Sequence, residues 1–95
     1  MSDPFVRLEV LEEERVGDEL LLLHPRTLEV KLLNETGAIL WEALPTFPTA
    51  EALVDLLAEA RPELGRDRCA EQVTNFLEGL LAAGLIERRV DSGTA

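Results

Sequence analysis

The chain has 95 residues, of which 46% are hydrophobic and 29% charged, and its formal net charge is −10 because 19 acidic residues outnumber 9 basic ones. This length suffices for one small core, so we expect a single domain over residues 1–95, with its core at 5–90 and a disordered tail at 91–95. Because nucleic-acid binders gain most of their affinity from neutralised phosphates, so negative a chain argues against DNA or RNA as its partner.

The first third of the chain has the periodicity of β-strands. Apolar and polar residues alternate over residues 6–10 and again over 27–33, and a short apolar run fills residues 19–23. Turn-forming residues at 17–18 and 24–26 separate these three segments. The pattern predicts a three-stranded antiparallel meander with one buried face.

At Asn34 the periodicity changes to that of helices. Asn34 and Thr49 are good N-caps, and Pro45 and Pro62 each end the helix before them. Trp41 has the spacing of a core anchor in the first of these helices. The second helix is expected to point four apolar residues inward, namely Leu53, Leu56, Leu57 and Ala60.

A third helix is predicted over residues 67–83, with Gly84 as its C-terminal cap. Residues 85–90 have the pattern of a last short strand. Strands followed by three helices indicate an α+β fold of the winged helix-turn-helix type, in which a three-stranded antiparallel sheet precedes three helices.

The residues with chemical potential do not assemble into a catalytic or metal site. One histidine, His24, and one cysteine, Cys69, cannot form a zinc ligand set, and the chain has no glycine-rich phosphate loop and no Ser/His/Asp set. We interpret His24 as a solvated turn residue, Cys69 as a core residue, and the acidic run at 12–14 as a solvated edge or turn. We therefore expect no catalytic residue, no metal and no cofactor, and hence no enzyme.

Compartment and partner class follow from further features. A single cysteine fits a reducing cytosol, no apolar run reaches the about 18 residues of a membrane span, and residues 1–4 have no secretion signal. We expect a cytoplasmic protein that does not contact membranes. Glu51, Asp55 and Glu59 line one helical face, which is either a solvent face or a docking stripe for a basic partner.

The third helix has an unusually wide apolar face. Its apolar residues cover an arc of about 160° at 100° per residue, whereas a helix on one core needs only about 100°. Two interpretations are open: burial on two sides, or an open groove along Gln72, Phe76 and Gly79. Gly79 costs a helix interior about 1 kcal/mol relative to alanine, which indicates that another group approaches closely there.

The segment from Leu20 to Glu87 resembles the PqqD family, also called the RiPP recognition element. The resemblance depends on several motifs that occur together in order. They are Leu20-Leu21-Leu22-Leu23-His24-Pro25, Leu33-Asn34-Glu35-Thr36-Gly37-Ala38, Ile39-Leu40-Trp41-Glu42, Thr49-Ala50-Glu51-Ala52-Leu53, Phe76-Leu77-Glu78-Gly79-Leu80 and Gly84-Leu85-Ile86.

The resemblance implies a winged-helix domain that binds the leader segment of a ribosomally synthesised precursor peptide. The leader is expected to add as a strand along the third strand, to pack on the third helix, and to be presented to a modifying enzyme such as a radical SAM protein, a cyclase or a leader peptidase. The implied peptide-binding residues are Thr27, Leu28, Glu29, Val30, Lys31 and Leu32 in the strand, and Arg68, Gln72, Val73, Phe76 and Leu80 in the helix.

Two other function classes are compatible with this fold. A winged-helix DNA-binding regulator is the first, although its recognition helix would carry Glu71 and Glu78 beside Arg66 and Arg68. The second is a protein-interaction or dimerisation module, in which a free strand edge pairs with its own copy to form a homodimer.

Overall fold

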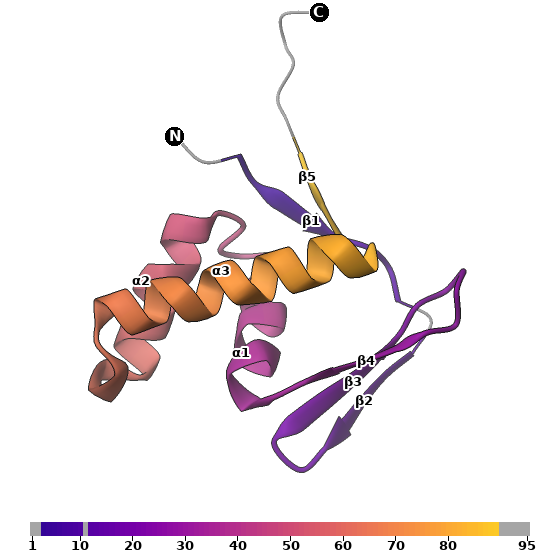
Figure 1. The fold of residues 1–95 in the computed structure, drawn as a ribbon, viewed down its shortest axis with the longest axis horizontal. Coiled ribbons are helices and arrows are strands. Elements are labelled where there is room, and N and C mark those ends of the chain that lie inside the picture. Colours follow the sequence, from indigo (N-terminus) through magenta and orange to yellow (C-terminus); the bar gives the residue numbers. More distant parts are fainter. Residues whose placement is uncertain (1–2, 11, 90–95) are drawn as a thin grey trace, which may run out of the picture.

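A computed structural model of the chain describes residues 3–10 and 12–89, and the tail predicted at 91–95 lies outside the described residues. Its strands are β1 (Phe5–Arg7), β2 (Glu12–Val16), β3 (Glu19–Leu23), β4 (Val30–Leu33) and β5 (Ile86–Arg88). Its helices are α1 (Glu35–Ala43), α2 (Ala50–Ala60), the short 3-10 helix η1 (Pro62–Leu64) and α3 (Arg66–Ala83). Figure 1 shows the three α-helices gathered beside the sheet of β2, β3 and β4, while β1 and β5 lie together at the end of α3.

The larger sheet is an antiparallel meander in the order β2-β3-β4. Val16 pairs with Glu19 across a two-residue turn, and Gly17 in this turn has a φ of +65°, a conformation that glycine adopts without strain. The predicted α+β fold, with its three-stranded antiparallel sheet followed by three helices, is therefore confirmed.

The position of the first meander strand differs from the prediction. Residues 6–10 were expected to form it, but β2 occupies that place, and β1 pairs with β5 in a separate two-stranded sheet. All five residues of β2 are exposed, because the strand lies at a sheet edge with its acidic side chains in solvent. An apolar periodicity is therefore absent from β2, and the interpretation of the acidic run as a solvated edge is confirmed.

The connection from β3 to β4 is longer than predicted, and β4 is correspondingly shorter than the strand expected over residues 27–33. The N–H of Leu28 donates to the carbonyl of His24 (3.0 Å), the N–H of Thr27 donates to Nδ1 of His24 (3.2 Å), and Leu28 has a left-handed φ of 63°. Thr27, Leu28 and Glu29 thus precede the strand. The side chain of His24 is buried under this turn, so the interpretation of His24 as a solvated residue is wrong.

The helix boundaries follow the predicted caps. Asn34 Oδ1 accepts the backbone N–H of Gly37 at 2.8 Å, and Thr49 Oγ1 accepts that of Ala52 at 3.2 Å. Gly84 ends α3 in the left-handed region, with a φ of +73°. Pairing of β5 confirms a short strand directly after this cap.

One hydrophobic core joins the helices to the inner face of β3. Trp41 and Cys69 are both buried in it, which confirms their interpretation as core residues. On α2, Leu53 and Leu57 are fully buried, whereas Ala60 is exposed. The prediction that Ala60 points inward is wrong because it is the last residue of α2, where the chain turns away towards η1.

Candidate functional site

The free edge of β4 is the first element of the candidate site. In the described part of the chain, β4 pairs only with β3, so its other edge has no strand partner. Hydrogen-bonded pairs alternate along an antiparallel ladder, and the N–H of His24 donates to the carbonyl of Glu29. We therefore expect the backbone N–H and C=O groups of Val30 and Leu32 to point towards the open edge.

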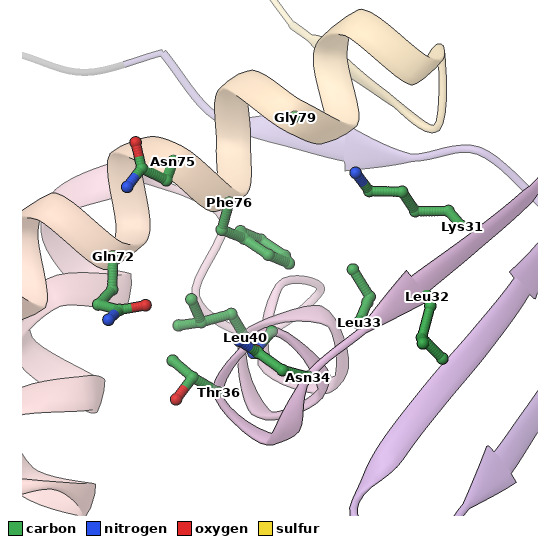
Figure 2. A pocket seen from close by; sticks show the side chains of 11 residues that line it. Lys31, Leu32, Leu33, Asn34, Thr36, Leu40, Gln72, Asn75, Phe76 and Gly79 are labelled. Carbon is green, nitrogen blue, oxygen red and sulfur yellow. The ribbon is translucent and has the colours of Figure 1, made fainter.

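A cavity of about 190 Å³ lies between β4, α1 and α3. Its lining combines apolar side chains with uncharged polar ones, and Lys31 is the one charged residue among the described residues that line it. Figure 2 shows the phenyl ring of Phe76 extending from α3 into the space between this helix and β4. The lining residues are Lys31, Leu32, Leu33, Asn34, Thr36, Gly37, Leu40, Gln72, Asn75, Phe76 and Gly79.

A second cavity, of about 370 Å³, adjoins the first one towards the C-terminal end of α3. We call the two cavities together the groove. It is lined by His24, Glu29, Val30, Lys31, Gly79, Ala82, Ala83 and Leu85. Because Lys31 and Gly79 line both cavities, these two residues mark the boundary between them. The open edge of β4 is thus accompanied by a groove with two recesses.

Lys31 crosses the groove at this boundary. Figure 2 shows its side chain extending from β4 towards α3, near Gly79. A Cβ atom placed on Gly79 would lie 3.6 Å from Nζ of Lys31. The group that approaches Gly79 closely is therefore the ammonium of Lys31, which answers the expectation raised by a glycine in a helix interior.

The structure brings together the groove-facing part of the predicted site. Lys31 and Leu32 line the first cavity from β4, although the side chain of Leu32 points to the opposite face of the sheet, and Gln72 and Phe76 line the cavity from α3. Phe76 is largely buried and yet lines that cavity. The groove interpretation of the wide apolar arc therefore applies at its margin, while Val73, Leu77 and Leu80 are buried in the core.

Other predicted site residues lie elsewhere. Val73 and Leu80 are fully buried in the core, and Arg68 is exposed in the first turn of α3, outside both cavities. Thr27 and Leu28 lie in the connection before β4 and line neither cavity. Glu29 and Val30 line the second cavity.

Sequence reasoning missed the contribution of α1 to the groove. Thr36, Gly37 and Leu40 come from the first turns of α1, and Asn75 comes from the exposed side of α3. In the sequence, the Asn34 cap is the only signal that α1 lies near the groove, because it places the start of α1 directly after β4. It does not specify which helical face lies under α3.

The outer face of the sheet, turned away from the helices, is a second exposed surface. On β4, Val30 is 61% and Leu32 is 52% exposed. Their cross-strand partners are Leu23 and Leu21, which in turn pair with Glu12 and Glu14 of β2. A shallow cleft of about 200 Å³ is lined by Glu12, Glu14, Leu21, Leu23 and Val30. We call this apolar surface with its glutamate border the outer face.

The described residues contain no group of three or more histidine, cysteine or acidic side chains that could hold a metal ion. Cys69 is fully buried, and Nδ1 of His24 accepts the backbone N–H groups of Arg26 and Thr27 in its own turn. No helix of the described chain is long and apolar enough to cross a membrane.

Comparison with known proteins gives two matches. The family model described as "Coenzyme PQQ synthesis protein D (PqqD)" matches residues 19–86. The solved structure "TbiB1 in Complex with the TbiA(beta) Leader Peptide" is similar, with a TM-score of 0.74 and 25% sequence identity, and the match covers 90% of this chain and 98% of that chain. No match was found among curated proteins.

Two helical glycines give a matched test of this geometry. A Cβ atom on Gly79 would meet only Lys31 Nζ at an ordinary distance, so we expect Gly79→Ala to raise the free energy of unfolding by about 0.5–1 kcal/mol through helix propensity. A Cβ atom on Gly37 would lie 3.2 Å from Cβ of Leu33 and 3.3 Å from Oδ1 of Asn34. We expect Gly37→Ala to lower the free energy of unfolding by about 1–3 kcal/mol, as overpacking does.

Urea denaturation of both variants measures these changes. If Gly79→Ala destabilised the domain as much as Gly37→Ala, the space above Gly79 would not be open and the groove would be narrower than described.

Proposed function

The chain belongs to the PqqD family, and on that premise we propose that it binds the leader segment of a ribosomally synthesised precursor peptide and presents it to a modifying enzyme. The observation that carries this proposal is the free edge of β4 beside a groove whose far wall is α3. The similar TbiB1 structure contains a leader peptide. We propose that this protein acts as a cytoplasmic peptide carrier that performs no catalysis itself.

Strand addition explains how such a protein can hold a peptide loosely and still select it. Backbone hydrogen bonds to Val30 and Leu32 provide affinity for any extended peptide, while the two cavities select side chains that point into the groove. The peptide must lose conformational freedom on binding, which offsets part of the gain. The result is reversible binding, as handing a substrate to an enzyme requires.

The two edges of the β2-β3-β4 sheet allow a direct test. The probe is a leader segment identified by testing the short peptides encoded near the gene for this chain for binding to the protein. On binding, we expect slower amide hydrogen exchange at Val30 and Leu32, because these N–H groups gain partners, and unchanged exchange in β2 at the opposite edge. Protection of β2 instead of β4, or no protection at saturating peptide, would contradict strand addition at β4.

Phe76 provides a test of the groove. We expect Phe76→Ala to weaken leader binding at least about fivefold, because an apolar anchor loses its contact surface, with the affinity measured by titration calorimetry. Phe47→Ala is the matched control, since Phe47 is 38% exposed and lines neither cavity. Phe76 also belongs to the core, so Phe76→Leu, which retains most of the buried volume, is measured alongside. Unchanged affinity in both folded Phe76 variants would remove this residue from the site.

We propose that the modifying enzyme docks on the outer face. Its exposed valine and leucine side chains adjoin the edge where the leader would lie, and Glu12 and Glu14 border them. An exposed apolar patch with a charged rim is typical of a protein interface. The partner surface is then apolar with basic residues around it. The acidic stripe on α2 is the alternative, but there Asp55 already pairs with Arg66.

Charge reversal distinguishes the two surfaces. We expect Glu14→Lys to weaken docking of the modifying enzyme, and raised salt to weaken docking of the unaltered protein, because both reduce attraction to a basic rim. Glu59→Lys makes the same charge change on α2 and is expected to leave docking nearly unchanged. Binding measured at low and high salt gives both results. A larger effect of Glu59→Lys would assign docking to the α2 stripe.

A further inference from the structure

Lys31 divides the groove into two recesses of different surroundings. One recess is lined by Leu33, Leu40 and Phe76, and the other by Ala82, Ala83 and Leu85. The aliphatic stem of Lys31 starts from β4, and its ammonium lies over Gly79 of α3. A peptide lying along β4 therefore passes an ammonium between two recesses, each of which has an apolar wall beside polar lining residues.

This ammonium lacks a partner in the described part of the chain. No ion pair includes Lys31 among the described residues. Among the described residues, Glu29 is the only acidic one that lines either cavity, and it is exposed and forms no ion pair with Lys31. The other titratable lining group in the part of the chain that the structure describes is His24, whose Nδ1 accepts hydrogen bonds from the turn before β4.

A bound peptide would cover the ammonium of Lys31, a residue that is already half-buried. Removing a charge from water without pairing it is costly, so a peptide that places a neutral apolar side chain over Lys31 binds at a penalty. A peptide that places a carboxylate there gains a charge-assisted hydrogen bond instead. The chain as a whole has a net charge of −10, whereas Lys31 places a positive charge in the groove.

Resting on the proposed function, we propose that Lys31 selects leader peptides with an aspartate or glutamate between two apolar residues, in the pattern apolar–any–acidic–any–apolar. A strand added to β4 continues the pleat of the sheet, so every second side chain points into the groove. Those side chains are about 6.6–6.8 Å apart. The central one meets Lys31, and the side chains two positions before and after it enter the two recesses.

The test uses a displayed library of random peptides, selected on the folded full-length protein. We expect the unaltered protein to enrich the apolar–any–acidic–any–apolar pattern. Lys31→Glu should enrich lysine or arginine at the central position with the same apolar flanks, and Lys31→Met should enrich neither charge. Arg89→Glu is the matched control, because it changes the net charge as Lys31→Glu does but lies outside both cavities.

A selected peptide then gives the magnitude. Replacing its central carboxylate by the matching amide should weaken binding to the unaltered protein at least about tenfold, in line with a hydrogen bond to a charged group. The same replacement should have little effect on Lys31→Met. Because Lys31 is the only lysine, lysine-specific isotope labelling gives one side-chain ammonium signal, and this signal should shift with the acidic peptide and much less with the amide peptide.

The outcomes separate this inference from the proposed function. Peptides that bind and protect the β4 edge but show no preference for a central acid would overturn the role of Lys31 and leave strand addition intact. Failure to select any peptide would overturn both. An equal preference for acids in Lys31→Met would assign the selection to another residue and overturn the inference.

Discussion

The groove depends on the position of α1 between the sheet and α3. This helix packs against β3 and β4 on one side and against α3 on the other. Gly37 permits the close approach to β4, because a Cβ atom there would lie 3.2 Å from that of Leu33, and Leu40 reaches the groove floor. α1 thus separates α3 from the edge of β4. The backbone at this edge stays accessible, while the side chain of Leu33 on the inner face of β4 remains packed in the core.

Local signals predicted the helices well. Asn34 and Thr49 each accept a hydrogen bond from a backbone N–H in the first turn of a helix, and Gly84 ends α3 in a left-handed conformation. These effects are local and can be predicted without knowing the rest of the fold. Strands have weaker local signals, because their stability depends on partners that are distant in the sequence. The exposed strand β2 has no buried face to impose a periodicity, and β1 finds its partner only at the far end of the chain.

From the residue pattern alone, the candidate site was predictable only at the apolar margin of α3, whereas Lys31 and Leu32 of β4 were implied by the resemblance to the PqqD family. The margin of Gln72, Phe76 and Gly79 followed from the wide apolar arc of α3, and the structure places all three along one cavity. The burial of His24 did not follow, because it depends on a turn whose hydrogen bonds close over the side chain. The role of Lys31 at the groove boundary required three-dimensional placement, since nothing in the sequence links it to Gly79.

An open strand edge invites pairing with another copy, and Lys31 opposes this. Edge strands are commonly protected by being short and by carrying an inward-pointing charge. β4 has four residues, and Lys31 lies on its groove side. An antiparallel pairing of two β4 edges centred on this residue would bring two ammonium groups together under low solvation, where like charges repel. A homodimer through this register is therefore disfavoured, whereas a foreign strand with a carboxylate at the same position is attracted. One side chain thus both protects the edge and selects the strand that occupies it.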